Sequence, residues 1–184
     1  LHRISRPVSL VHEMTEIHRR VIAAEGPALL FERPVDATGV INPVPVLVNL
    51  FGTTERIALG LGVEPAGLPA LGETLGWLRH PEPPANLGAA WARMPAVKAA
   101  LAIGTQNMTR PPSQTRRWTG PAIDVTALPV QWCWPGEPAP LVTWPLVVTQ
   151  APDDPCDVNV GIYRMQVLGR DRLLVRWLAH WGGA

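Results

Sequence analysis

Four polar side chains stand within apolar stretches toward the carboxyl end of the chain. Asn159 and Arg164 lie in the segment Asn-Val-Gly-Ile-Tyr-Arg, and Arg176 and His180 lie in the segment Arg-Trp-Leu-Ala-His. A polar group in apolar surroundings costs free energy unless a partner or a ligand compensates for it. These four side chains are therefore the first candidates for a binding or catalytic site.

Two of the four could bind a metal ion. The side chain of Asn159 offers a neutral oxygen, which suits a hard cation such as Mg²⁺ or Mn²⁺. Asn is also common as a turn former at the start of a strand. His180 could be a metal ligand or a hydrogen-bonded core residue. The residues alone leave these alternatives open.

The two arginines suggest recognition of an anion. Arg keeps its charge in proteins, and its planar guanidinium matches a carboxylate or a phosphate. Arg164 lies between Tyr163 and Met165, and Arg176 lies between Val175 and Trp177. The alternative is that both arginines occupy the solvent face of an amphipathic strand.

Alternating apolar residues predict that the two segments are the halves of one β-hairpin. Its strands would cover 158–168 and 173–178, joined by a turn at 169–172. Side chains alternate along a strand, so Asn159 and Arg164 should point to opposite faces unless the strand bulges at Gly161 or starts after Asn159. Arg176 and His180, four residues apart, should share a face. The register stays open because Arg170-Asp171 is not a preferred two-residue turn.

The rest of the chain divides into a helical part followed by a strand-rich part. We expect an α+β protein with an N-terminal α/β domain at 1–105, a linker at 106–121, and the first strands of a β-barrel or sandwich at 122–184. The leucine stripe in the helix over 68–78 predicts core packing. The expected elements are helices at 12–25, from Thr53, at 68–78, 87–93 and 96–103, and strands at 1–10, 28–32, 44–50, 123–125 and 141–149.

Composition excludes several classes of protein. Hydrophobic residues make up 47% and charged residues 17%, which indicates a packed core and argues against disorder. A formal charge of +1 gives no basis for nucleic-acid binding. Two cysteines without zinc spacing predict buried thiols in a reducing, cytoplasmic compartment. No apolar run reaches the roughly 18 residues of a spanning helix, so any contact with a membrane would be peripheral.

Six motifs occur in a fixed order along nearly the whole chain. They read GPALLFE at 26–32, VLVNLFG at 46–52, LRHPEPP at 78–84, CWP at 133–135 with LVTW at 141–144, NVGIYR at 159–164, and RWLAH at 176–180 with GGA at 182–184. In this order they resemble the UbiD family of decarboxylases, named for 3-polyprenyl-4-hydroxybenzoate decarboxylase of ubiquinone biosynthesis.

The resemblance implies a fold and a set of cofactors. The strand-rich part would begin a split β-barrel like that of flavin reductases, which binds prenylated FMN and Mn²⁺ or Mg²⁺, with K⁺ as a further cation. Asn159 would be a metal ligand, and His180 would approach the metal or the phosphate. Arg164 would be the catalytic residue that orients the substrate carboxylate. The cofactor-binding residues would be Ile162, Tyr163, Arg164, Arg176, Trp177, Leu178, Trp181 and Gly182.

The implied activity is the non-oxidative decarboxylation of an aromatic or unsaturated carboxylic acid. The N-terminal motifs favour 3-polyprenyl-4-hydroxybenzoate as the substrate. The modified flavin would serve as an electron sink while CO₂ leaves. A prenyl-FMN synthase would supply the cofactor, and the chain would act as a homo-oligomer or with a complementing chain.

Two departures from the family pattern lead to an alternative. Trp181 stands where the family has an arginine, and the family's second metal ligand and proton donor lie beyond Ala184. Because the chain also starts with Leu1, we expect part of a longer enzyme that is inactive alone. The alternative is a short non-catalytic paralogue or subunit that binds cofactor or docks onto a full-length decarboxylase. A further interpretation sets the family resemblance aside and predicts only an α/β unit followed by a β-domain of unknown role.

Overall fold

A computed structural model describes residues 1–80, 83–102, 108–154 and 156–177. The chain forms two compact units. One combines Leu1–Gly52 with Trp118–Ala184, and the other is Thr53–Arg117. The domain boundaries expected from the sequence, at 105 and 121, stay a prediction, since a compact unit can combine segments of more than one domain.

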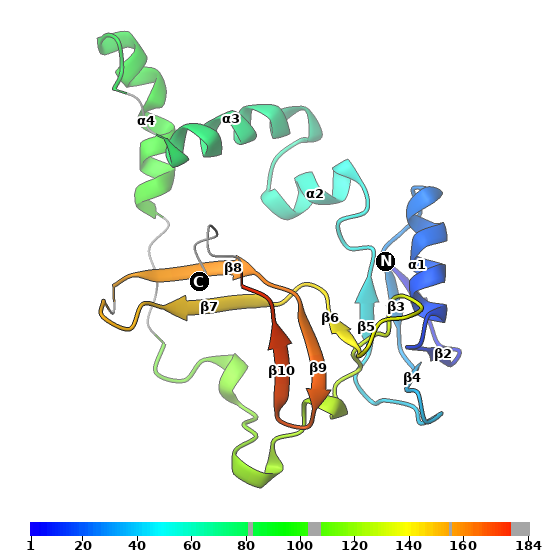
Figure 1. Ribbon diagram of the computed structural model, residues 1–184. Helices are drawn as coiled ribbons and strands as arrows, with labels where there is room; N and C mark the ends of the chain where they lie inside the picture. Colours follow the sequence, from blue (N-terminus) through cyan, green and yellow to red (C-terminus); the bar gives the residue numbers. More distant parts are fainter. Residues whose placement is uncertain (81–82, 103–107, 155, 178–184) are drawn as a thin grey trace. The chain divides into compact units, whose positions relative to one another are not determined.

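The amino-terminal part of the first unit is a helix packed on short strands (Figure 1). In one sheet β3 runs parallel to β1 and antiparallel to β5, and in a second sheet β2 runs parallel to β4. The helix confirms the one expected over 12–25. The elements are β1 His2–Ile4, β2 Val8–Ser9, α1 Glu13–Ala23, β3 Leu29–Phe31, β4 Pro34–Val35 and β5 Val46–Val48.

The core of this part joins the helix to the strands. Met14 and Phe31 are fully buried, and Ile17 and Val21 of α1 pack against the same cluster. The spacing of Met14, Ile17 and Val21 along the helix places all three on one face. The apolar run at 28–32 therefore forms a buried strand as expected. The run at 44–50 also contains a strand, but only Val48 of that strand is buried, and Leu47 is exposed. The buried cluster is Val8, Leu10, Met14, Leu29, Phe31 and Val48.

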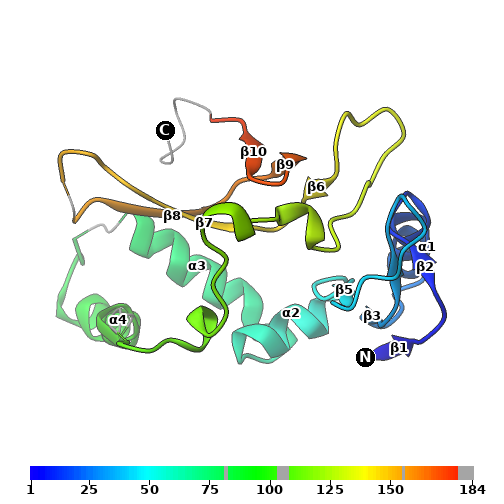
Figure 2. The same ribbon diagram turned by 90° about the horizontal axis from the view of Figure 1, so that it is seen from below.

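Five strands follow in the carboxyl-terminal part of the first unit. Strand β9 lies between β6 and β10, all antiparallel, while β7 and β8 pair only with each other among the described residues. Figures 1 and 2 show that β8 and β9 run in different directions. The strands are β6 Leu141–Val142, β7 Leu146–Gln150, β8 Val158–Ile162, β9 Met165–Gly169 and β10 Arg172–Val175.

The long strand expected over 158–168 is wrong. It breaks at Tyr163 and Arg164 because β8 pairs with β7, whereas β9 pairs with β6 and β10. The residues before the break therefore do not face the returning strand β10. The strand does not bulge at Gly161, which was one of two ways in which Asn159 and Arg164 could share a face, since the pairing of β8 with β7 is regular throughout.

The turn between β9 and β10 agrees with the expected position at 169–172. Gly169 pairs with Arg172, and Val167 pairs with Leu173, so Leu168 is the extra residue of a bulge. A two-residue loop of Arg170 and Asp171 is unfavourable, and a bulge beside it adds the local twist that the hairpin needs.

A further correction concerns residues 123–125, which were expected to form a strand. The chain forms 3-10 turns there, η3 Gly120–Ala122 and η4 Val125–Ala127. The carboxylate of Asp124 accepts the backbone N–H of Thr126, which starts the second turn. A short acidic side chain competes in this way with strand pairing.

The second unit contains the expected helices with two differences. Thr53 caps α2 as expected, because its hydroxyl accepts the backbone N–H of Arg56. Helix α4 continues through Pro95, where two short helices were expected; its many alanines favour helix strongly enough to offset the proline. The leucine stripe of α3 includes no buried residue. The elements are α2 Thr54–Leu61, η1 Pro65–Gly67, α3 Leu68–Arg79, α4 Leu87–Ala102 and η2 Pro112–Gln114.

The described residues form both helices and sheets, which confirms the expectation of a protein with mixed α and β structure. None of the described helices is long and apolar enough to cross a membrane.

Candidate functional site

The candidate site is built on strand β8 and the bend that follows it. Along β8 the side chains alternate between a partly buried face and an exposed face. Asn159 and Gly161 are on the partly buried face, whereas Ile162 lies on the other face and is 47% exposed. The strand therefore separates the side chains of two residues that were predicted to share a site, Asn159 and Ile162.

Asn159 has a specific partner at the end of the strand. Its side-chain Nδ2 donates a hydrogen bond to the hydroxyl of Tyr163, at 3.1 Å. Asn159 also lies opposite Thr149 of β7 in the antiparallel pair. The amide is therefore held from one side, and no hydrogen bond to its Oδ1 is found within the described part of the chain.

Gly161 makes room for the tyrosine ring. A Cβ atom at this position would lie 2.5 Å from Cε2 of Tyr163 and 3.0 Å from Cζ. Gly161 is therefore the floor against which the ring of Tyr163 packs. Any larger residue would displace the ring that carries the hydroxyl.

Trp177 packs on the same tyrosine. The ring centroids of Tyr163 and Trp177 lie 4.8 Å apart with an interplanar angle of 55°. This tilted geometry is favourable for an aromatic pair. Because Trp177 follows β10, the contact joins the end of β8 to the end of the β9–β10 hairpin.

The predicted arginines lie close to this cluster in sequence and are both exposed. Arg164 lies in the bend between β8 and β9, and Arg176 follows β10. In the described residues, neither makes an ion pair. Each guanidinium is therefore available for an anion.

Arg164 also acts on a buried thiol. Burial raises the pKa of Cys133 above its ordinary value, and the positive charge of Arg164 acts in the opposite direction. The loop of Cys133 is fixed by Glu137, whose Oε2 accepts the backbone N–H groups of Cys133 and Trp134 at 3.0 and 3.1 Å.

The same loop is tied to the amino-terminal part. The backbone N–H of Trp132 donates to the carbonyl of Leu10 at 3.0 Å, and that of His12 donates to the carbonyl of Trp132 at 2.9 Å. The hydroxyl of Thr15 in α1 donates to the side chain of Gln131 at 3.3 Å.

Four of the predicted site residues, Leu178, His180, Trp181 and Gly182, lie outside the described residues. Asn159, Tyr163 and Trp177 are brought together, and Arg164 directly follows Tyr163. The packing of the Tyr163 ring on Gly161 was not predicted from the sequence. The spacing of two residues between Gly161 and Tyr163 would place both on one face of an extended chain.

The described residues contain no group of three or more His, Cys, Asp or Glu side chains that could hold a metal ion. Asn159 has the right donor chemistry for Mn²⁺ or Mg²⁺, but it supplies only one ligand. Any such metal would need further oxygen or nitrogen ligands beside Asn159.

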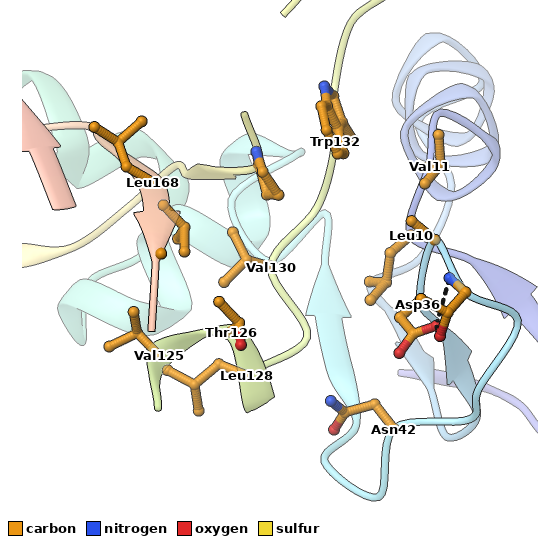
Figure 3. A pocket seen from close by; sticks show the side chains of 15 residues that line it. Leu10, Val11, Asp36, Asn42, Val125, Thr126, Leu128, Val130, Trp132 and Leu168 are labelled. Atoms are coloured by element: carbon orange, nitrogen blue, oxygen red, sulfur yellow. Dashed lines mark hydrogen bonds between the residues drawn. The ribbon is translucent and has the colours of Figure 1, made fainter. Parts of the chain in front are cut away.

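A cavity of about 360 Å³ lies elsewhere in the first unit, between the loop after β4 and the end of β9 (Figure 3). Its polar groups are bonded within the protein. Asp36 accepts the N–H of Thr38 and of Val40, and Asn42 donates to the carbonyl of Ala127 at 2.8 Å. None of the predicted site residues lines it. The lining also includes Leu10, Val11, Val125, Leu128, Val130, Trp132 and Leu168.

Two family models match the chain. The one described as the 3-octaprenyl-4-hydroxybenzoate carboxy-lyase N-terminal domain matches residues 1–75, and the one described as the Rift-related domain of the same carboxy-lyase matches residues 104–184. The chain belongs to the UbiD family. It carries the N-terminal portion of a UbiD protein, as its six motifs predict.

Solved structures of UbiD-class enzymes are similar to this chain. An evolved dimeric form of HmfF from Pelotomaculum thermopropionicum, in complex with prFMN, is 23% identical with a TM-score of 0.65; 96% of this chain and 35% of that chain are covered. The apo 3,4-dihydroxybenzoic acid decarboxylase AroY of Klebsiella pneumoniae is 21% identical, with a TM-score of 0.66 and coverage of 97% and 34%.

A third structure is the vanillic acid decarboxylase ShVdcCD of Sedimentibacter hydroxybenzoicus in closed form. It is 18% identical, with a TM-score of 0.69, and 98% of this chain and 34% of that chain are covered. At these identities the likeness shows the fold. The UbiD chain described here spans about a third of the length of the structures it matches.

Proposed function

We propose that this chain forms the N-terminal part of a UbiD-type carboxy-lyase that decarboxylates an aromatic or unsaturated acid, with 3-polyprenyl-4-hydroxybenzoate as its substrate. One observation carries the proposal. Both domain models of the carboxy-lyase match in order, and the second covers β8 with Asn159 and Arg164. The strand-rich part then begins a split β-barrel, and the enzyme acts in ubiquinone biosynthesis in the cytoplasm or at the inner membrane surface.

Arg164 would bind the carboxylate of the substrate. Its guanidinium is exposed at the bend after β8, and among the described residues it makes no ion pair. A planar guanidinium can hold a carboxylate by two parallel hydrogen bonds and keeps its charge at every physiological pH. Arg164 therefore fixes the direction in which CO₂ leaves.

The bend also suits an aromatic, phosphate-bearing cofactor. Trp177 is 41% exposed beside Tyr163, and Arg176 adds a cation next to it. We propose that these residues hold prenylated FMN, which would supply an electron sink, and that Asn159 contributes one ligand to Mn²⁺ or Mg²⁺. The HmfF structures hold prFMN or FMN, which supports a flavin here.

The remaining catalytic groups would come from additional polypeptide. Decarboxylation needs an acid with a pKa near neutrality to replace CO₂ by a proton. We propose that this acid and the other metal ligands lie in the part that completes the site, in a longer chain, a second copy or a complementing chain. The two-chain name of ShVdcCD is consistent with the last case.

The test is decarboxylation by the full-length protein that carries this sequence, expressed with a prenyl-FMN synthase. Release of CO₂ would be measured from 3-polyprenyl-4-hydroxybenzoate, 3,4-dihydroxybenzoate and vanillate. We expect Arg164→Ala to lower kcat/KM by at least about 100-fold, since a carboxylate-orienting contact is lost. The control is Arg172→Ala, which removes an exposed arginine from β10. Equal activity of the two variants would contradict the proposal.

A non-catalytic subunit is the second candidate, and one observation favours it. The outer face of the β7–β8 pair is apolar and exposed, which is typical of a surface that another polypeptide covers. In that case the chain would bind the cofactor or a full-length decarboxylase without turnover. Flavin binding without CO₂ release from any of the three acids would support this candidate.

A further inference from the structure

We propose that Tyr163 is a positioning residue for Asn159: its hydroxyl holds the amide so that the carbonyl oxygen Oδ1 is presented to a divalent cation. The inference rests on the proposed function, in which Asn159 is a metal ligand. It adds the group that orients the ligand.

The position of the hydroxyl is fixed by packing. The ring of Tyr163 lies on Gly161, where a Cβ would come within 2.5 Å of it, and Trp177 covers it with a centroid distance of 4.8 Å. Because the ring contacts both Gly161 and Trp177, we infer that the hydroxyl has little freedom to move. It therefore forms a stable partner for a neighbouring side chain.

The hydrogen bond then fixes the amide. Nδ2 of Asn159 donates to the Tyr163 hydroxyl at 3.1 Å. The two polar atoms of a planar amide point in different directions, so this bond turns Oδ1 away from the tyrosine. Among the described residues, no hydrogen bond to Oδ1 is found. The oxygen is thus left for a ligand outside these residues.

A cation would reinforce this arrangement. A tyrosine hydroxyl can accept or donate, so it tolerates either orientation of the amide. A divalent cation binds oxygen and repels the N–H group, and only one orientation lets Oδ1 meet the cation while Nδ2 stays bonded to Tyr163. Removing the hydroxyl leaves Nδ2 without its partner and releases the amide to other rotamers.

Tyr163 is the only tyrosine of the chain, which makes the test specific. In protein labelled with ¹³C at tyrosine Cζ, a single NMR signal reports this hydroxyl. Without metal we expect Asn159→Ala to shift the signal. The control, Thr149→Val, removes the hydroxyl opposite Asn159 in β7 and should leave the signal in place. Equal signals in wild type and Asn159→Ala would overturn the inference.

The second measurement uses Mn²⁺ as the probe with the full-length protein. In this protein the Tyr163 signal is identified by its loss in Tyr163→Phe. We expect bound Mn²⁺ to broaden the Tyr163 signal, and Asn159→Ala to abolish this effect. Tyr163→Phe keeps the ring but should weaken Mn²⁺ binding, measured by electron paramagnetic resonance, by roughly 3- to 10-fold, the population ratio that one ordinary hydrogen bond maintains. Thr149→Val should bind as the wild type does.

The outcomes separate the two levels of the argument. If Asn159→Ala abolishes Mn²⁺ binding but Tyr163→Phe binds it as tightly as the wild type, the positioning role of Tyr163 is wrong and the metal role of Asn159 stands. If Mn²⁺ leaves the Tyr163 signal of the wild type sharp, the metal is not at Asn159. In that case Asn159 is not a metal ligand, and the positioning role of Tyr163 is wrong as well.

Discussion

At the scale of single residues, Gly161 is the position where the site tolerates least change. A methyl group there would overlap the ring of Tyr163, so the ring must move and its hydrogen bond to Asn159 must break. We expect Gly161→Ala to destabilise the protein by about 1–3 kcal/mol, as overpacking does. Urea unfolding measures this change.

The chain offers a matched control for this variant. Gly169 is also a strand glycine, but a Cβ there would meet no atom within 4 Å. We expect Gly169→Ala to change the free energy of unfolding by less than about 0.5 kcal/mol. A Gly161→Ala protein as stable as Gly169→Ala would mean that Tyr163 does not pack on Gly161.

The two cysteines should differ in reactivity. The thiolate is the nucleophile, and burial raises the pKa of Cys133, so its thiol stays protonated at neutral pH. Cys156 is free and exposed, so the prediction that both thiols are buried is wrong for this residue. We expect iodoacetamide at pH 7.5 to alkylate Cys156 and to leave Cys133 unmodified in the folded protein, as read by mass spectrometry.

Cys156→Ala and Cys133→Ala serve as the two controls. The first variant should take up no label until it is unfolded, and the second should be labelled like the wild type. Rapid labelling of Cys133 in the folded Cys156→Ala protein would show that the loop around Cys133 opens.

At the scale of elements, helix α1 carries a pH-dependent interaction. Hydrogen bonds and ion pairs from Arg19 and Arg20 lower the pKa of Glu16 from 4.5 to about 2. A carboxyl with a lowered pKa in the folded state stabilises the protein above its unfolded pKa, and this contribution is lost as the pH falls toward 2. We expect Glu16→Gln to lose less stability than the wild type between pH 5 and pH 2.

Acid titration of thermal unfolding would measure this difference. Because the pairs are exposed, high salt should shrink it. Glu25→Gln is the control, since it removes a carboxylate that follows the same helix and makes no ion pair among the described residues. A wild type and a Glu16→Gln protein with parallel pH profiles would contradict the prediction.

Local patterns were sufficient to predict the elements whose partners are close in sequence. The spacing of Met14, Ile17 and Val21 predicts α1 because all three pack on strands nearby. The break at Tyr163 could not be predicted, since the apolar pattern continues across it and only the change of pairing partner interrupts the strand. The same holds for the candidate site. The motif at 159–164 identifies its residues, but the hydrogen bond between Asn159 and Tyr163 depends on packing and could not be predicted.

At the scale of the whole molecule, the outer face of the β7–β8 pair is still unexplained. Five apolar side chains point outward along the two strands, with 47–74% of their surface exposed. A soluble protein rarely leaves such a face open. The five outward-facing side chains are Leu146, Val148, Val158, Val160 and Ile162.

Adjacent valines of β7 give a direct test of whether more polypeptide covers this face. Val148 is 65% exposed, whereas Val147 points to the partly buried side. In the chain alone we expect Val148→Lys to cost less than about 0.5 kcal/mol and Val147→Lys about 1–3 kcal/mol, because only the second buries a charge. Urea unfolding measures both.

In the full-length protein the ranking should change. The UbiD structures that match this chain are about three times as long. In a protein of that length, as proposed above, the additional polypeptide would pack on the outer face. Val148→Lys should then cost as much as Val147→Lys, because the lysine would be buried against apolar side chains. If Val148→Lys is tolerated equally well in the short and the full-length proteins, no part of the longer chain packs on the outer face, and the prediction is wrong.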